Sequence, residues 1–426
     1  MILAFHLGRV YTLSFAEVLA VLTRHHVPYT IKEFYTEMLV IETSAELDLT
    51  SLQKRLGGVI KIIEILDAIP RKKKTDFVSF TVRPYFTLAF LHEKFLASYS
   101  GKVQFGVSLY PISYQTNLYG QNKRVGMEIK NTLTNAGVSC RLVLPEGASS
   151  SLPSVAVTNN HLLEKGVEID LLVSDKEIYI GKTLSVQDFA DYGRRDYQRP
   201  SRDARAGMLP PKVAQMMINV ASFTPEEREK RAYILDPFCG TGTLLQEALL
   251  IGFKVLGSDI SEAAVDATEK NLNWFRIRYK LAPGLFQVFK SDVGSVSEGL
   301  EGKQPIAIVT EGTLGPVYVK PPTQKEIEKN FKDLSKLFVA AFKKFRKILA
   351  TGRSIVMAFP AYKLGNKHIS FPDIDKILKL GYDIQALVPQ DLIKTYPFLK
   401  VTPRGSVIYD RKDQIVVREI IHFVVK

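Results

Sequence analysis

Residues 234–243 read ILDPFCGTGT and decide the fold of the larger part of the chain. Residues 233–235 predict the end of a short buried strand, and residues 244–251 predict an amphipathic helix. Gly240 and Gly242, in the turn between them, let the backbone adopt positive φ and let a ligand approach without meeting a Cβ atom. The helix directs its free N–H groups at the same ligand. The stretch therefore predicts a ligand site between a strand and a helix.

The turn differs from that of dinucleotide-binding proteins, which carry a third glycine three residues after the second. Leu245 occupies that position here, and Asp236 precedes the two glycines in the pattern D-x-x-x-G-x-G. This pattern favours S-adenosylmethionine (SAM), whose amino group is cationic and which has no pyrophosphate. We therefore expect a SAM site at this turn.

Two further strand ends carry acids. Residues 254–256 predict a second strand, and Asp259 follows it at the distance where nucleotide-binding folds hold ribose hydroxyls. Residues 284–289 predict a third strand followed by Asp292, which is placed to meet an adenine amino group. The alternative makes Asp259 a helix N-cap and Asp292 a turn residue.

Composition limits the class of protein. A chain of 426 residues predicts two or three domains, and its net charge of +13 is consistent with a polyanionic partner, RNA or DNA. The two cysteines, Cys140 and Cys239, indicate a reducing compartment and exclude both a disulfide framework and a cysteine-based zinc site. We expect no metal.

The apolar N-terminus resembles a signal sequence only superficially, because His6 and Arg9 interrupt it. No run approaches the roughly 20 apolar residues of a membrane span. We therefore expect a cytoplasmic protein with no membrane partner. Residues 14–23 predict a helix, with Ser14 as its N-cap and Glu17 at the capping-box position.

Short strands alternate with helices in two N-terminal stretches. Residues 1–70 show a β-α-β-α-β order, and residues 102–180 add a helix at 121–136, a strand at 154–158 and a closing hairpin. The basic run at 71–74 is either a solvated loop or a phosphate contact. Other basic residues of the second stretch are candidates for one basic face: Lys102, Lys123, Arg124, Lys130 and Arg141.

Residues 186–212 are rich in arginine, tyrosine and proline. Arginine interleaved with tyrosine suits the clasping of phosphates and the stacking of bases. The alternative is an interdomain linker whose arginines pair with nearby aspartates. The arginines are Arg194, Arg195, Arg199, Arg202 and Arg205, and the aspartates are Asp188, Asp191, Asp196 and Asp203.

Residues 306–310, IAIVT, predict another strand, which is followed by Glu311. A carboxylate at the carboxyl end of such a strand lies where α/β folds place their chemistry. Residues 323–349 predict one or two amphipathic helices. A hairpin of residues 406–409 and 414–423 closes the predicted sheet in the manner typical of class I SAM-dependent methyltransferases.

The motifs DPFCGTGT, GSDI and RPSRDARAGMLPPKVAQMMINVA together resemble the THUMP-domain tRNA guanosine-10 N2-methyltransferases over roughly residues 190–426. Residues 1–185 are similar to that family more loosely. The resemblance implies an α/β fold of three domains: a ferredoxin-like domain at 1–95, a THUMP-like RNA-binding module at 96–185, and a class I SAM-methyltransferase domain with a Rossmann-like sheet at 186–426.

The resemblance also implies a function. The THUMP module of the family grips the acceptor end of tRNA, and the Rossmann-like domain moves a methyl group from SAM to a guanine exocyclic amine. A protein activator subunit stays open as a further partner. The cofactor contacts that the resemblance implies are Asp236, Gly240, Gly242, Asp259 and Asp292, and we add Pro237, Thr243 and Ile260 as their neighbours in the same turns. The candidate RNA contacts, chosen for their charge, are Lys123, Arg124, Lys130, Arg194, Arg195 and Arg199.

The sequence departs from the family at the catalytic loop. The family reads D-P-P-Y where this chain reads E-G-T-L at residues 311–314. Glu311 keeps a carboxylate for base assistance, whereas Leu314 offers no ring to stack on a base. Tyr318 and Pro316 are the candidate replacements. We assign the catalytic loop to Glu311, Gly312, Gly315 and Pro316. Two alternatives stay open: an RNA-binding protein with a degenerate methyltransferase domain, and an amino-methyltransferase acting on DNA or protein.

Overall fold

The computed structural model describes residues 1–72, 77–97, 101–113, 118, 120–147, 149–202, 207–365, 367–411 and 414–426, without the side chains of 78–80. Lys73 and Lys74 of the basic run, and Asp203 and Arg205 of the arginine-rich segment, lie outside these residues. The chain divides into two compact units. The first comprises Met1–Tyr11, Val27–Lys54 and Val59–Phe189, and the second comprises Thr12–His26, Arg55–Gly58 and Ala190–Lys426.

The strands described in the first unit form one mixed sheet in the order β2-β3-β1-β4-β8-β7-β5-β6. β5 runs parallel to β6 and β7, and the other neighbours are antiparallel. Their bounds are β1 Ile2–Leu7, β2 Tyr29–Tyr35, β3 Met38–Thr43, β4 Val59–Pro70, β5 Val103–Pro111, β6 Cys140–Val143, β7 Gly166–Val173 and β8 Glu177–Val186. The helical elements are α2 Leu49–Arg55, α3 Leu88–Leu91, α4 Gln121–Asn135, α5 Ser154–Asn159 and two π-helical turns, Phe77–Val82 and His92–Leu96.

The expected strand at 154–158 is wrong, because these residues form α5. Pro153 adopts an extended conformation before the helix, and its carbonyl accepts hydrogen bonds from the N–H groups of Ala156 and Val157. The alternating apolar pattern of five residues did not distinguish a single helical turn from a strand.

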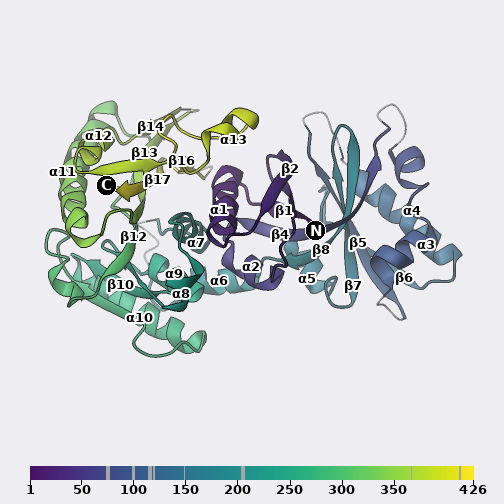
Figure 1. The fold of residues 1–426 in the computed structure, drawn as a ribbon, viewed down its shortest axis with the longest axis horizontal. Helices are drawn as coiled ribbons and strands as arrows, with labels where there is room; N and C mark the ends of the chain where they lie inside the picture. Colours follow the sequence, from purple (N-terminus) through teal and green to yellow (C-terminus); the bar gives the residue numbers. More distant parts are fainter. Residues whose placement is uncertain are drawn as a thin grey trace. The chain divides into compact units, whose positions relative to one another are not determined.

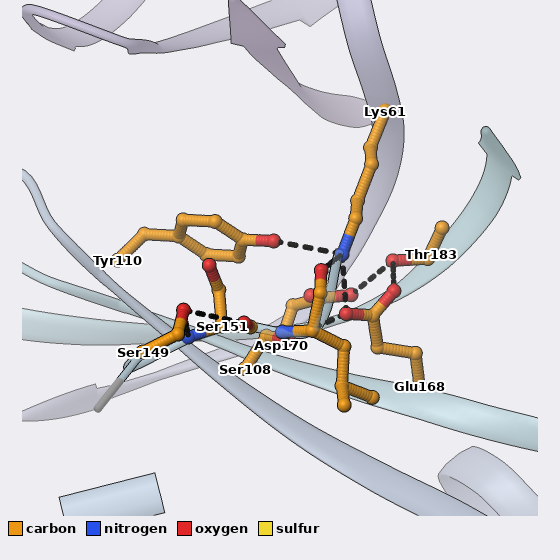
Figure 2. Close-up of polar contacts among 9 residues, drawn as sticks. Lys61, Ser108, Tyr110, Ser149, Ser151, Glu168, Asp170 and Thr183 are labelled. Carbon is orange, nitrogen blue, oxygen red and sulfur yellow. Dashed lines mark hydrogen bonds and ion pairs between the residues drawn. The ribbon is translucent and has the colours of Figure 1, made fainter. Parts of the chain in front are cut away.

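A buried polar network lies at the centre of this sheet (Figure 2). Lys61 Nζ, from β4, lies 2.5 Å from Glu168 Oε1 and 3.1 Å from the Tyr110 hydroxyl, and both Lys61 and Glu168 are fully buried. The Thr183 hydroxyl lies within 2.8 Å of carboxylate oxygens of both Glu168 and Asp170. One hydroxyl proton serves only one acceptor, so the second carboxyl must itself donate. Burial, followed by the charge of Glu168, raises the pKa of Asp170 and makes it the protonated partner.

The strands described in the second unit form a sheet in the order β11-β10-β9-β12-β13-β17-β15, with β14 paired to β13 and β16 to β17. The strands from β11 to β13 are parallel, and β17 is antiparallel to β13, as the predicted closing hairpin requires. Their bounds are β9 Tyr233–Asp236, β10 Lys254–Asp259, β11 Phe286–Lys290, β12 Pro305–Glu311, β13 Ser354–Leu364, β14 Lys367–Ser370, β15 Tyr382–Gln385, β16 Val407–Tyr409 and β17 Val416–Val425.

Helices cover both faces of this second sheet. Figure 1 shows α11 and α12 on one side and α7 and α9 on the other. The phenylalanines Phe338, Phe342 and Phe345 on α11 are fully buried, because they recur at helical spacing and pack into one apolar core. The bounds are α6 Phe189–Tyr197, α7 Pro211–Val220, α8 Pro225–Glu229, α9 Thr243–Ile251, α10 Glu262–Arg278, α11 Gln324–Ile348, α12 Ile374–Leu378, α13 Gln390–Thr395 and a 3₁₀ turn at Glu298–Leu300.

The helix α1, Tyr11–Arg24, begins three residues before the predicted start. The expected cap at Ser14 and capping-box role of Glu17 are therefore wrong, since both side chains are buried inside the helix. Glu17 instead accepts hydrogen bonds from the backbone N–H groups of Gly57 and Gly58, both at 2.8 Å. Among the residues that the structure describes, no helix is both long and apolar enough to cross a membrane.

Candidate functional site

The strand order of the second unit reverses between β9 and β12. The chain proceeds from β9 to β10 on one side, and β12 lies on the other side of β9. Open α/β sheets bind ligands at such a reversal, beyond the carboxyl ends of the strands. β9 ends at Asp236 and β12 ends at Glu311, so both predicted carboxylates lie at this point.

Two adjoining hollows open here and share Phe238, Gly240 and Glu311 as lining residues. The larger has a volume of about 570 Å³ and the smaller about 440 Å³. The larger brings together most of the predicted site: Pro237, Gly240, Asp259, Ile260, Asp292, Glu311, Gly312 and Gly315. The smaller is lined by the predicted Asp236 and Thr243, and by Arg202, Met208 and Leu209. Gly242 and Pro316 line neither hollow.

The glycine turn has the backbone that its sequence predicts. Gly240 and Gly242 have φ of +53° and +80°, which favours glycine at both positions. A Cβ atom on Gly240 would meet nothing within 4 Å, so the turn leaves open space for a ligand. Gly242 is the N-cap of α9, which begins at Thr243. The turn therefore presents a helix N-terminus at the site.

Asp259 supports the same turn, because its Oδ2 accepts a hydrogen bond from Gly240 N at 3.1 Å. Its Oδ1 accepts from Ser261 N, and Ser261 itself is the N-cap of α10. The alternative assignment of Asp259 as that N-cap is therefore wrong. Asp292 accepts from Gly294 N at 2.8 Å, as a turn residue does, while it also lines the larger hollow.

Asp236 is buried at the floor of the smaller hollow. Its Oδ1 accepts from the Thr310 hydroxyl at 2.6 Å and from Phe238 N at 3.2 Å. Burial raises the pKa of Asp236 to about 7, and the negative charges of Asp259 and Glu311 act in the same direction. This carboxyl is thus poised between its two protonation states near neutral pH.

Glu311 forms an ion pair with Arg418 of β17 through Oε1 and the guanidinium Nε. Burial raises the pKa of Glu311, and the Arg418 guanidinium opposes that rise. Sequence reasoning missed Arg418. Its signal was the charged pair Arg418 and Glu419 within the largely apolar run VVREIIHFVV. A charge that is fully buried in a central strand needs a partner, and the partner here is the predicted catalytic carboxylate.

The loop after Glu311 is closely packed. A Cβ atom on Gly312 would lie 2.4 Å from the Met357 side chain, and one on Gly315 would lie 2.3 Å from the Asn330 amide. Tyr318, a candidate stacking ring, packs edge-on against Tyr362 with centroids 5.9 Å apart. The Tyr318 ring is half-buried, and its edge contact ties it to Tyr362.

Cys239 is buried beneath the turn, where its sulfur lies 3.7 Å from the Thr268 hydroxyl. Burial raises the pKa of the thiol well above its ordinary value. A thiolate nucleophile is therefore disfavoured, and Cys239 acts as a small packing residue.

The arginine-rich segment is largely structural. Arg195 is buried, pairs with Asp191 and Glu247, and stacks on the Tyr192 ring at 4.2 Å. Arg199 is also buried and donates to the Thr243 hydroxyl at 2.6 Å. The expectation that these two arginines contact RNA is contradicted by their burial, which favours the linker alternative.

Arg194 remains half-buried and pairs with Asp191 at 3.0 Å. In the first unit, Lys123 and Arg124 are exposed on α4, and Lys130 is half-buried on the same helix. Burial raises the pKa of Cys140, and the charges of Lys130 and Lys102 both oppose that rise, so these two predicted cations share one region.

The fold and the site define a SAM-dependent methyltransferase domain. The family described as RMKL-like, methyltransferase domain (UPF0020) matches residues 199–370. The probable tRNA (guanine(10)-N2)-dimethyltransferase of Methanothermococcus thermolithotrophicus is 32% identical over 126 residues, which are 29% of this chain and 70% of that relative. The chain belongs to this methyltransferase family.

Other relatives match over less of their length. The tRNA (guanine(10)-N2)-dimethyltransferase of Pyrococcus abyssi is 34% identical over 32% of this chain and 36% of its own. In this relative and in two others of the same name, from Methanothermobacter thermautotrophicus and Methanocaldococcus jannaschii, the matched segment spans 36%, 40% and 54% of the relative's own length. The crystal structure of TrmN from Thermus thermophilus aligns with a TM-score of 0.54 and 12% identity, covering 100% of this chain and 99% of that one, which supports the fold alone.

Proposed function

We propose that the protein transfers a methyl group from SAM to the exocyclic N2 amine of a guanosine in tRNA, the substrate in the names of its relatives. The observation that carries the proposal is the convergence of Asp259, Asp292 and Glu311 on one hollow. Its volume of about 570 Å³ lies within the range of small-molecule sites. When bound, SAM supplies an electrophilic methyl group on a sulfonium.

The residues of the hollow fit this donor. The Asp259 carboxylate lies at the end of β10, where it suits ribose hydroxyls, and Asp292 lies at the edge where it suits an adenine amino group. The exposed Ile260 offers an apolar surface to the adenine ring. The rest of the SAM molecule is held by Asp236 and by the glycine turn, which contains Pro237, Gly240, Gly242 and Thr243.

Glu311 acts on the acceptor. The lone pair of a guanine amine is delocalised into the ring, so the amine must be drawn into hydrogen bonds before it attacks. Glu311 accepts an N–H hydrogen bond and takes up the proton that the amine loses. Gly312, Gly315 and Pro316 shape the loop that positions the base. The amine nitrogen bonds to the methyl carbon as the carbon–sulfur bond breaks, and the sulfur leaves as a neutral thioether.

We infer that the first unit binds the RNA, with residues 1–95 as a ferredoxin-like domain and 96–185 as a THUMP-like module, and that residues 186–426 form the methyltransferase domain. The exposed cations of α4, Lys123 and Arg124, with Lys130, support a phosphate contact. Arg194 is retained as a weaker candidate. A basic net charge of +13 supports the same kind of partner.

Transfer of tritium from labelled SAM to bulk tRNA, with DNA and protein as parallel substrates, tests the proposal. Labelled tRNA that yields N2-methylguanosine on nucleoside digestion is the expected result. Label in DNA or protein instead would support the amino-methyltransferase alternative. Binding of RNA without any transfer would support a degenerate domain, which the packed Tyr318 ring and Leu314 favour as the second candidate.

Calorimetry with SAM tests the cofactor site separately. Asp259→Ala should weaken SAM binding about a hundredfold, because it removes a carboxylate that serves both the ligand and the Gly240 turn. Asp266→Ala, on the exposed face of α10, is the matched control and should leave the affinity unchanged.

A further inference from the structure

Arg418 lies at the amino end of β17, which runs antiparallel to β13. This direction places Arg418 at the same edge of the sheet as the carboxyl end of β12, where Glu311 lies. Its side chain is fully buried and reaches across β13, which separates β12 from β17 in the sheet; Glu311 is in register with Ala358 of β13 and Arg418 with Pro360. Burying a charged guanidinium costs free energy unless the group is paired and hydrogen-bonded, so the partners of Arg418 indicate its role.

Arg418 holds two walls of the site at once. Its Nε pairs with Glu311 Oε1, and its Nη2 donates to the carbonyl of Gly207 at 2.5 Å. Gly207 begins the segment of Met208 and Leu209 that lines the smaller hollow together with Glu311. The planar fork of a guanidinium fixes both contacts in one geometry, which a lysine does not reproduce.

The pairing occupies one oxygen of Glu311 and not the other. Oε1 is engaged by Arg418, and among the described residues no hydrogen bond engages Oε2. Glu311 lines both hollows, and its side chain retains 20% exposure there. The remaining oxygen is thus available to a hydrogen-bond donor in the hollow, such as an amine N–H.

We propose that Arg418 is the positioning residue of the active site: it keeps Glu311 ionised, aims its second oxygen at the acceptor amine, and fixes the 207–209 segment beside it. This inference rests on the proposed function for its acceptor.

The charge of Arg418 matters because the other groups in the hollows are mostly acidic. Among the described residues, the titratable and charged groups that line the two hollows with Glu311 are Asp236, Cys239, Asp259, Asp292 and Arg202. Burial favours the protonated form of Glu311, and the charge and hydrogen bond of the Arg418 guanidinium oppose it. Removing the guanidinium therefore raises the pH below which Glu311 is protonated. A protonated Glu311 cannot accept a proton from the amine.

The pH dependence of kcat with tRNA, measured for full-length wild type, Arg418→Gln and Arg418→Lys, tests the inference. Arg418→Gln should shift the acidic limb of the profile upward by about one to three pH units. It should also lower kcat at pH 7 more than tenfold, while the Kd for SAM changes less than about threefold. Arg418→Lys keeps the positive charge but loses the planar two-pronged geometry of the guanidinium. It should return the acidic limb to its wild-type pH but recover only part of kcat.

Arg404→Gln is the matched control, because Arg404 also lies near a buried glutamate (Glu419, 3.7 Å) and donates to a backbone carbonyl away from the hollows. It should leave the profile in place. An unshifted limb in Arg418→Gln, or an equal shift in Arg404→Gln, would overturn the inference. If Arg418→Gln does not fold, an Arg418→Lys enzyme with unaltered kcat would overturn it.

A second measurement separates this inference from the proposed function. Infrared difference spectra of wild type against Glu311→Gln report the ionisation of the Glu311 carboxyl without turnover. A wild-type enzyme that labels no tRNA contradicts the proposed function. The infrared titration then still decides whether Arg418 keeps Glu311 ionised, and a carboxyl that titrates at the same pH with and without Arg418 contradicts the inference alone.

Discussion

Thr310 donates its hydroxyl proton to Asp236 Oδ1 at 2.6 Å, and this bond joins the carboxyl ends of β12 and β9. Both residues are buried, and the two strands are the pair between which the strand order reverses. The bond therefore links the strand that carries the glycine turn to the strand that carries Glu311. A neutral hydroxyl, rather than a cation, meets this carboxyl, so burial still raises its pKa to about 7.

Thr310→Val should lower the free energy of unfolding by about 1–3 kcal/mol, because valine has the same shape but leaves a buried carboxyl short of a donor. Urea denaturation measures the loss. The control is Thr351→Val, whose exposed hydroxyl donates to the carbonyl of Lys426 and should matter by less than about 0.5 kcal/mol. Equal losses in the two variants would show that the Thr310–Asp236 bond has no special weight.

The stability of the second unit should fall as pH rises from about 4.5 to about 7. Burial raises the pKa of Glu17 to about 7 in the folded state, from an ordinary value of 4.5. The folded state therefore binds this proton more tightly, and its contribution is complete below pH 4.5 and lost as pH approaches 7. The difference is on the order of 3 kcal/mol. Denaturation midpoints measured across this range test the sign.

Glu17→Gln should reduce the pH dependence of the free energy of unfolding. Part of the dependence should remain, because the pKa of Asp236 is raised in the same direction. The variant should also be less stable at neutral pH. The carboxylate accepts from Gly57 N, Gly58 N and Asn219 Nδ2, and an amide nitrogen would face one of these donors. The exposed Glu269→Gln is the control. A wild-type slope that survives intact in Glu17→Gln would assign it to other groups.

The predictable part of this protein is the part that local sequence encodes. The alternation of strands and helices, the glycine turn and the acids at strand ends depend on residues close in the chain. The fold of the second unit and the meeting of Asp259, Asp292 and Glu311 therefore followed from the sequence. Parallel strands bring such ends to one edge whatever the intervening helices contain.

The remainder depends on contacts between distant residues. Ser14 and Glu17 match a capping box locally, but the partners of Glu17 lie about 40 and 200 residues further along the chain. Arg418 enters the site from an antiparallel strand 107 residues after Glu311, and no spacing predicts that approach. The same holds for Arg195 and Arg199, whose burial follows from partners on α9.

Lys61→Met should destabilise the first unit by about 3–5 kcal/mol, because it leaves the buried Glu168 without its cation. Chemical denaturation followed by circular dichroism measures the change. Lys182→Met is the matched control, since Lys182 pairs with Glu64 at 3.3 Å on the same sheet but is about one-third exposed. The control should cost no more than about 1 kcal/mol. A Lys61→Met protein as stable as Lys182→Met would mean that the network in Figure 2 tolerates an unpaired carboxyl.

Glu311→Gln and Glu311→Ala should both abolish methyl transfer while leaving the Kd for SAM within about threefold. They should differ in stability, because alanine leaves the Nε and the charge of the buried Arg418 guanidinium without a partner, at a cost of about 3–5 kcal/mol. Glutamine retains a carbonyl oxygen for that guanidinium. Calorimetry and denaturation of both variants check the two effects separately. Unchanged turnover in either variant would discard the role of Glu311.

Gly315→Ala should disable the catalytic loop more than it destabilises the fold. Gly315 has a φ of +87°, so any side chain costs about 1–2 kcal/mol in backbone strain. The added methyl would also lie 2.3 Å from the Asn330 amide. Asn330 donates to the Tyr362 hydroxyl at 2.6 Å, so this amide does not yield freely and the loop must move instead.

Gly302→Ala isolates the strain from the collision, because Gly302 has a similar φ of +78° and a Cβ atom there would meet nothing within 4 Å. Both variants should lose comparable stability from strain, with a further loss in Gly315→Ala. Only Gly315→Ala should lower kcat, by tenfold or more, because a displacement of about 1 Å at the reacting groups costs a hundredfold in rate. Equal kcat values in the two variants would mean that the loop from Gly312 to Gly315 does not position the acceptor.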